Sequence, residues 1–283
     1  MFAFMLLLMV LLVVFGSASP ARAWGPATHL ELGRELLADK DRLPLPVATL
    51  LARYPYDFLY GNIAADMVVG KKFVDPLRHC HIWPVAFQLL EKAVIPAQQA
   101  FVYGYLTHLA ADLVAHNVFV PTKIVQHYYR RRVLHLYWEM RFEVSVRHQL
   151  WQYAHLISRR CRWDHDPLLA ENLTPTLFSF PVNRRIFNTI LLLNRTRRWQ
   201  KMLARLDHSP RCQLSAEDVA DYKQRCLANM REILQNFQAS PLCAEDPRGE
   251  QQLLKAKKTA RRLRRQKTLL TPGQLEEYLQ SFL

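Results

Sequence analysis

Residues 105–116 read Tyr-Leu-Thr-His-Leu-Ala-Ala-Asp-Leu-Val-Ala-His, a run that is rich in Leu, Ala and Val and contains neither Gly nor Pro. This composition predicts a helix. His108, Asp112 and His116 are four residues apart and would lie along one narrow face of that helix. Two imidazoles and a carboxylate inside an apolar segment need a partner, because buried unpaired polar groups are costly. The simplest shared partner is a metal ion, and the alternative is three core residues that each find a separate hydrogen bond.

A second pair of ligand-type residues follows further along the chain. His135 and Glu139 stand at i and i+4 in the segment 122–160, which predicts a second, long helix that could be kinked or broken. Pro121 is suited to the start of that helix. Two helices joined there can lie antiparallel and direct five ligand-type side chains into one space, as helix bundles do when they build metal sites. Together, the ligand-type residues of the two helices favour a shared metal ion over separate hydrogen bonds.

The composition predicts an all-α fold. Half of the 283 residues are apolar and only 8 are Gly, which favours helices over a turn-rich β fold. The pattern predicts a loop over 164–181 and a linker over 241–249. Helices are expected over 28–37, 43–53, 57–69, from the His79 region through Leu90, 97–118, 122–160, 183–206, and from the capping box at Ser215 to about Phe237, before a basic helix and a short terminal helix.

The first 23 residues have the pattern of a secretory signal peptide. The apolar run Met1–Phe15 is followed by Ala21-Arg22-Ala23, which fits a small-residue cleavage site. We therefore expect a protein exported to the periplasm or the medium after cleavage before Trp24. A retained membrane anchor is the alternative, although the run is short for a bilayer. The five cysteines include no C-x-x-C pair, so a thiolate zinc site is not suggested, while one or two disulfides are open to an exported chain.

The formal net charge of +14 favours anionic partners such as phosphodiesters, nucleic acid or acidic lipid headgroups. Much of this charge is local, because residues 255–267 carry eight basic residues and no acid. We expect this segment to be a solvated helix, with contact to an acidic membrane surface or nucleic acid as the alternative. The expected organisation is a signal peptide over 1–23, a helical metal-binding domain over 24–210 and a helical C-terminal extension over 211–283.

The candidate ligands are gathered in the first half of the chain, where eight of the eleven histidines lie before residue 150. They are the Trp24 amino terminus, His29, Asp66, His79 or His81, His108, Asp112, His116, His135 and Glu139. This set resembles the zinc-dependent phospholipase C and fungal single-strand nuclease superfamily, whose members are all-helical trinuclear zinc enzymes. The resemblance covers about Trp24–Glu143. It is greatest to the bacterial zinc-dependent phospholipase C branch, which includes the catalytic domain of glycosylphosphatidylinositol phospholipase D.

The resemblance implies three sets of zinc ligands. In this family the mature N-terminal Trp chelates a zinc ion through its α-amine and carbonyl, so Trp24 and His29 would hold one zinc, with Asp112 bridging to a second. The implied second set is Asp66, His81, His108 and Asp112, and the implied third set is His116, His135 and Glu139. His81 is favoured over His79 because the family ligand lies just before an aromatic residue, and in this chain Trp83 follows shortly after His81. The His-x-x-x-Asp-x-x-x-His spacing is that of the glycosylphosphatidylinositol-cleaving relatives, and is two residues shorter than in the secreted phospholipases and nucleases.

The function that follows is an exported phosphodiesterase with up to three Zn²⁺ ions. It would hydrolyse phospholipid in the manner of a phospholipase C, by attack of a metal-activated water. Asp66 is the candidate general base as well as a ligand. A single-strand nuclease of the same superfamily is the first alternative, and would place base-stacking aromatics beside its metals. A non-catalytic zinc-binding or interaction protein that keeps the cluster for stability is the second.

Overall fold

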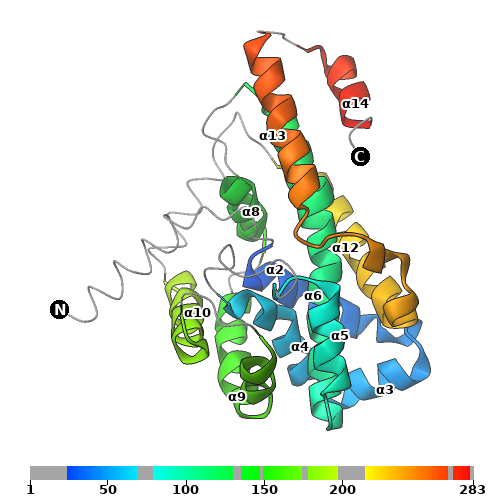
Figure 1. Ribbon diagram of the computed structural model, residues 1–283, viewed down its shortest axis with the longest axis vertical. Coiled ribbons are helices and arrows are strands. Elements are labelled where there is room, and N and C mark those ends of the chain that lie inside the picture. The colour runs from blue at the N-terminus through cyan, green and yellow to red at the C-terminus, as the bar shows by residue number, and fades with distance from the viewer. Residues whose placement is uncertain are drawn as a thin grey trace, which may run out of the picture.

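The computed structural model describes residues 24–68, 79–129, 135–146, 149–173, 178–196, 214–266 and 270–280 (Figure 1). Every regular element within these ranges is helical, which confirms the all-α fold. The α-helices are α2 (Pro26–Ala38), α3 (Leu45–Arg53), α4 (Pro55–Ala64), α5 (Trp83–Glu91), α6 (Pro96–Leu113), α7 (Val120–Gln126), α8 (His135–Val144), α9 (Gln149–Asn172), α10 (Phe180–Asn194), α12 (Ala216–Asn236), α13 (Glu250–Arg265) and α14 (Pro272–Gln280). Shorter 3₁₀ turns cover Lys40–Arg42, Ala65–Met67, Phe237–Ala239 and Pro241–Ala244, and a π-helical turn covers Val114–Phe119.

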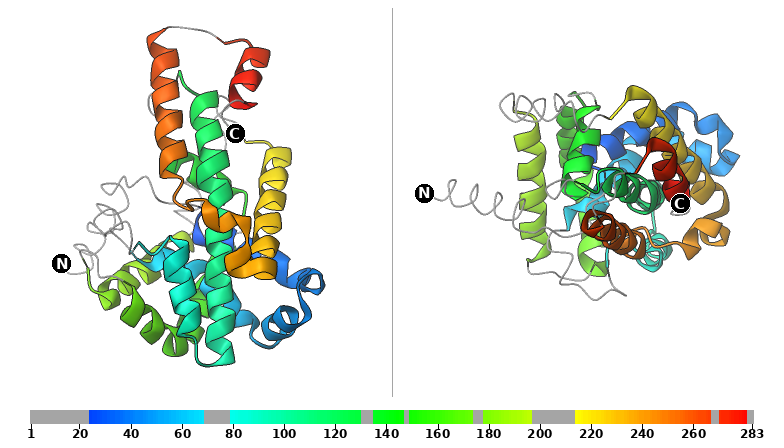
Figure 2. Two further views of the ribbon diagram at one scale, coloured as in Figure 1. Left: turned by 45° about the vertical axis from the view of Figure 1, so that its right-hand side comes forward. Right: turned by 90° about the horizontal axis from the view of Figure 1, so that it is seen from above.

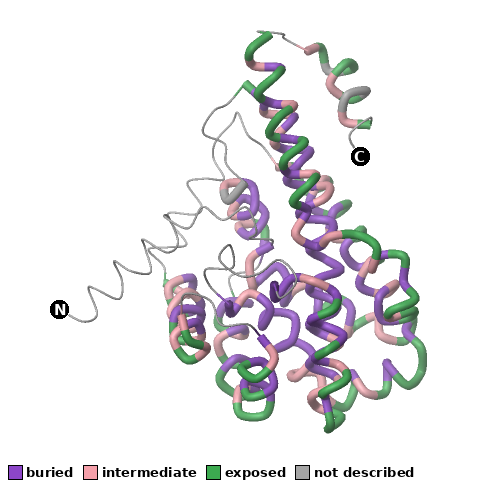
Figure 3. Tube along the Cα trace, in the orientation of Figure 1, coloured by how far each residue is buried: buried purple, intermediate pink, exposed green. Residues whose placement is uncertain are grey.

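Helix α6 is the axis around which the other helices are arranged. It continues through the π turn Val114–Phe119 directly into α7, so that the three segments form one long rod (Figure 2). Pro121 therefore lies at the start of a helix, as predicted, but α7 continues the line of α6 and does not turn back beside it. Because the wider turn places Pro121 at the first turn of α7, the missing N–H costs little there. Buried positions follow the lower part of this rod, where α2, α4, α5 and α12 surround it (Figure 3).

Helices α4 and α6 touch backbone to backbone through a pair of glycines. A Cβ at Gly61 would lie 1.9 Å from the carbonyl oxygen of Phe101, and a Cβ at Gly104 would lie 1.9 Å from that of Phe58. No side chain fits in either position, so each glycine is needed for the close approach. The contact brings the carboxyl end of α4, and the Ala65–Met67 turn after it, against the middle of α6.

The region from 122 to 206 differs most from the sequence prediction. The expected helix 122–160 is divided among α7, α8 and α9, and the expected helix 183–206 spans Phe180–Asn194 before residues 197–213, which lie outside the described ranges. The predicted loop 164–181 was wrong over 164–172, because α9 continues to Asn172 with Pro167 inside it. Tyr60 donates a hydrogen bond to Asp166, and Arg184 Nε lies 2.7 Å from the same carboxylate. These contacts hold the last turns of α9 and outweigh the cost of the proline.

The C-terminal helices pack on both ends of the central rod. Helix α12 starts at the predicted cap, where Ser215 Oγ accepts a hydrogen bond of 2.9 Å from the Asp218 N–H, and its apolar side joins the main core beside α6. The basic helix α13 lies along α7, away from the body (Figures 1 and 2). Its buried stripe is Leu253, Ala256, Ala260 and Leu263, of which the last three form a small second core with Val125 and Tyr128. The basic segment is therefore a packed helix with one apolar face rather than a fully solvated one.

The N-terminal segment, residues 1–23, lies outside the described residues, and so does Cys212. The other four cysteines are free thiols. Of the helices in the described ranges, none is both long enough and apolar enough to cross a bilayer.

Candidate metal centre

The contact between α4 and α6 fixes the orientation of one imidazole. His108 Nδ1 lies 2.9 Å from the backbone carbonyl oxygen of Asn62. A carbonyl can only accept a hydrogen bond, so Nδ1 carries the proton and donates it. In the neutral ring Nε2 then has a free lone pair, and this is the atom that faces the neighbouring ligand-type side chains. Hydrogen bonds of this kind to a carbonyl are typical of metal-binding histidines.

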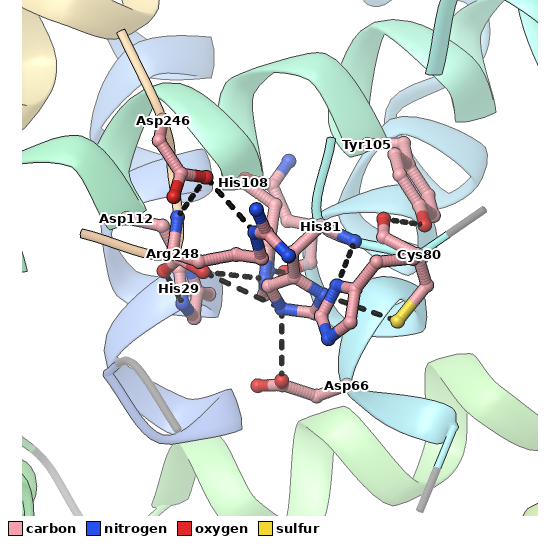
Figure 4. A network of polar contacts seen from close by, with 11 residues as sticks. His29, Asp66, Cys80, His81, Tyr105, His108, Asp112, Asp246 and Arg248 are labelled. Atoms are coloured by element: carbon pink, nitrogen blue, oxygen red, sulfur yellow. Dashed lines mark hydrogen bonds and ion pairs between the residues drawn. The ribbon is translucent and has the colours of Figure 1, made fainter. Parts of the chain in front are cut away.

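Five side chains from α2, the Ala65–Met67 turn, the His79–His81 segment and α6 meet around that lone pair (Figure 4). His108 Nε2 lies 3.1 Å from His81 Nε2 and 3.3 Å from Asp112 Oδ2. His81 Nε2 also lies 3.4 Å from both Asp112 Oδ2 and Asp66 Oδ1. On the other side of the same carboxylate, His29 Nε2 lies 3.2 Å from Asp112 Oδ1. Asp112 thus stands between two groups of ligand-type atoms, with one oxygen directed at each.

The distances and the unmet polar groups fit a metal ion. Ligand atoms of a four-coordinate zinc, with bonds of about 2.0–2.2 Å, are separated by about 3.2–3.6 Å. The contacts of Asp112 and His81 with their neighbours fall at 3.1–3.4 Å. Within the described part of the chain, both oxygens of Asp112 and both ring nitrogens of His29 are buried without a hydrogen bond of normal geometry. Metal ions on the two sides of Asp112 would satisfy both of its oxygens and His29 Nε2.

The electrostatics of the cluster keep the carboxylate at its centre ionised. Burial and the neighbouring His108 lower the pKa of His29, which disfavours a proton there. Burial would also lower the pKa of His108, but Asp112 and Asp66 outweigh it and raise that pKa. Burial would raise the pKa of Asp112, yet His108 and His29 hold it well below its ordinary value. A carboxylate that stays ionised at zero exposure is the kind of ligand that a dication needs.

His81 and His79 face different partners. His79 Nδ1 accepts a hydrogen bond of 3.0 Å from the His81 backbone N–H, so a neutral His79 carries its proton on Nε2. His81 instead directs Nε2 into the cluster, and its Nδ1 lies 3.2 Å from Cys80 Sγ. Two groups of metal-ligand type include His81, one with His108 and Asp112 and one with His79 and Cys80. A third group consists of His29, Asp66 and His108.

The residues expected around a third zinc are not assembled in the same way. His116 is buried on the π turn that follows α6, and Glu139 is buried on α8. Neither belongs to the groups of metal-ligand type formed by the described residues. The side chain of His135, at the first residue of α8, lies outside the described side chains. Trp24 is buried, and its ring packs 3.8 Å from Phe142 and 4.7 Å from Phe119, measured between centroids.

The structure adds supporting residues that the sequence did not reveal. Asn62 orients His108 through its carbonyl, and nothing in the sequence distinguishes it from other helical polar residues. Glu143 accepts hydrogen bonds from the Ala27 N–H at 2.8 Å and from the Thr28 N–H at 3.3 Å, and so caps the helix that carries His29. Burial raises the pKa of Glu143 to about 7, although these hydrogen bonds oppose the shift. A partial signal was present, since Glu143 is an acid in an apolar segment.

The C-terminal segment 245–249 also lies beside the cluster. Trp83 Nε1 donates to the carbonyl oxygen of Glu245 at 2.9 Å, and Asn117 Nδ2 donates to that of Asp246 at 3.2 Å. Trp83 follows His81 closely in the sequence, and Asn117 is next to His116. The sequence predicted only a linker here, because no local pattern connects this segment to residues more than a hundred positions away.

A family model described as zinc dependent phospholipase C matches residues 28–174, which are 147 of the 283 residues. The match begins in the first turn of α2, continues past the end of α9 and contains all five side chains of the cluster. No curated protein and no solved structure matches the chain.

Proposed function

Because the chain belongs to the zinc-dependent phospholipase C family, we propose that it is an exported zinc phosphodiesterase that hydrolyses phospholipid in the manner of a phospholipase C. The observation that carries the proposal is the convergence of His29, His81, His108, Asp66 and Asp112, at separations of 3.1–3.4 Å between neighbouring ligand atoms. The family match supports the zinc and the reaction class.

The proposed ligand roles follow from the way Asp112 divides the cluster. Its Oδ1 faces His29, so these two residues and the α-amine of Trp24 would hold one zinc ion. Its Oδ2 faces His81 and His108, which together with Asp66 would hold a second. His116, His135 and Glu139 are proposed for a third, with His79 as the less favoured alternative to His81. Zinc bound there would neutralise charge on the phosphate oxygens and lower the pKa of a water molecule to about 7.

Asp66 is the proposed general base. Its side chain is 15% exposed, whereas those of His29, His108 and Asp112 are fully buried. It is therefore the carboxylate of the cluster that solvent can reach. In the proposed step a water oxygen attacks phosphorus, and its proton passes to Asp66. The bond from phosphorus to the diacylglycerol oxygen breaks, and that oxygen takes up a proton from solvent, leaving diacylglycerol and a phosphorylated headgroup.

The test is metal analysis together with turnover of two substrates by the mature protein. We expect zinc in the freshly purified protein and hydrolysis of a choline phosphodiester, with Asp66→Asn reducing kcat strongly and the exposed Asp221→Asn leaving it unchanged. Cleavage of single-stranded DNA in place of the lipid would support the nuclease. Zinc without turnover of either substrate would support the non-catalytic protein.

The exposed side of α13 is the proposed docking surface for an acidic membrane. Lys258, Arg261 and Arg265 are exposed there, while the opposite side of the helix packs against α7. A basic surface on a helix that packs along α7 would be drawn to anionic headgroups, each charge contributing about 1 kcal/mol. This placement would bring a lipid-cleaving site to its substrate.

A further inference from the structure

The segment 245–249 passes between two parts of the candidate metal centre. Its first residue is tied to Trp83, two positions after His81, and its second to Asn117. Its last residue, Gly249, adopts a φ of +57°, and a Cβ there would lie 2.5 Å from the carbonyl oxygen of His116. Both ends of the segment are therefore fixed to residues at or next to proposed ligands, so its backbone passes beside the candidate metal centre.

Arg248 is the cation that this segment places there. Its side chain is only 14% exposed, whereas those of Asp246 and Glu250 are 35% and 56% exposed. Arg248 Nε donates to Asp246 Oδ1 at 3.0 Å, and Nη1 lies 3.3 Å from Glu250 Oε1. Figure 4 shows the side chain extending from Asp246 toward the histidine cluster. The two acids bind Nε and Nη1 of the guanidinium, and neither ion pair uses Nη2.

A guanidinium in this position has a clear chemical use. Arginine presents several N–H donors in one plane and binds phosphate oxygens more specifically than lysine does. A cation next to a zinc cluster would be repelled by the metal, and the two acids offset that repulsion until an anionic substrate arrives. Asp246 also accepts from the Arg248 backbone N–H at 3.1 Å, which leaves the side chain few alternative positions.

We infer that Arg248 binds a non-bridging oxygen of the phosphodiester substrate through Nη2. The inference rests on the proposed function and extends it, because Arg248 lies outside the residues 28–174 that match the family. The C-terminal region would then complete the substrate site of this chain.

The experiment compares zinc-loaded protein that begins at Trp24 with Arg248→Ala, Arg248→Lys and the control Arg225→Ala. Arg225 also bonds to an aspartate through Nε, at 2.9 Å, but is exposed on α12. The probe is inorganic phosphate, titrated by calorimetry, with steady-state kinetics on a choline phosphodiester beside it. For Arg248→Ala we expect phosphate affinity to fall about 10- to 100-fold, as for loss of one charge-assisted hydrogen bond, and KM to rise. Zinc content should not change, added guanidinium should restore part of the activity, and Lys should be intermediate.

The inference is overturned if Arg248→Ala binds phosphate as the unmodified protein does, if it loses zinc, or if the unmodified protein binds no phosphate. These results are distinct from a failure of the proposed function. If the unmodified protein binds phosphate but hydrolyses no phosphodiester, the phosphate titrations still decide whether Arg248 forms the anion site.

Discussion

His108 donates from Nδ1 to the backbone carbonyl of Asn62, 2.9 Å away and on a different helix. This hydrogen bond links the packing of the fold to the chemistry of the site, since it directs Nε2 at Asp112 and His81. It exists because Gly61 and Gly104 let α4 and α6 approach until their backbones touch.

Gly104→Ala should therefore affect stability and metal binding together. The added Cβ would lie 1.9 Å from the Phe58 carbonyl oxygen, so the helices must separate and the Asn62–His108 hydrogen bond must lengthen. We expect a loss of about 1–3 kcal/mol in the free energy of unfolding, or more, and weaker zinc binding. Urea denaturation and zinc titration measure the two effects. Gly273→Ala is the matched control, because nothing lies within 4 Å of the Cβ it would add.

Asp112→Asn should remove zinc from the purified protein. The carboxylate directs one oxygen at His29 and the other at His81 and His108, and its charge balances the metal. Loss of an orienting neighbour of a ligand already costs about 10–100-fold in metal affinity, so this change should cost more. Elemental analysis after dialysis checks it, with Asp221→Asn as the exposed control. Zinc retained at the original stoichiometry would contradict the ligand role.

Glu143→Gln should flatten the pH dependence of stability between about pH 4.5 and 7. Burial raises the pKa of Glu143 from 4.5 to about 7, so the folded protein binds more protons than the unfolded chain in this window. Stability therefore falls as the pH rises through it, by about 3 kcal/mol in total. Thermal unfolding of the zinc-free protein at a series of pH values measures the slope. The exposed Glu217→Gln should keep the slope of the unmodified protein, and an equal slope in Glu143→Gln would show that Glu143 ionises normally.

A Met residue ahead of Trp24 should cost the protein one zinc ion and most of its activity. Chelation by the amino terminus needs a free α-amine at Trp24, which only cleavage can supply. A protein that begins at Phe in place of Trp24 keeps the amine but shortens the ring that packs on Phe119 and Phe142, so it should keep its zinc. The measurement is the zinc stoichiometry of the unmodified protein, the form with the extra Met and the form that begins with Phe. Equal zinc content with and without the extra Met would end the hypothesis.

Replacement of Lys258, Arg261 and Arg265 by Gln should weaken binding to vesicles that contain anionic lipid. At about 1 kcal/mol for each charge, the affinity should fall about 100-fold. Cosedimentation with phosphatidylserine vesicles measures it, with pure phosphatidylcholine vesicles as the uncharged reference. A variant with Arg53, Arg159 and Arg185 changed to Gln carries the same net charge and should bind almost as the unmodified protein does. Equal losses in the two variants would indicate a general charge effect.

The local pattern of the chain determined its helices and the kinds of residue that could bind a metal. Helical periodicity depends on neighbours a few positions apart, so the apolar composition of residues 105–116 was enough to predict the central helix and the shared face of His108 and Asp112. The same local information failed over 164–172, where a loop was predicted but the helix continues and Asp166 contacts Tyr60 and Arg184.

Tertiary structure alone decided how the ligand-type atoms meet. Three features depend on contacts between residues that are 46 to more than 100 positions apart in the sequence. They are the side of the cluster that His29 joins, the partner that orients His108, and the approach of Arg248. Such contacts arise from helix packing. Gly61, Gly104 and the hydrogen bond from His108 to the Asn62 carbonyl set the distances between ligand-type atoms, and these distances cannot be read from the spacing of residues in the sequence.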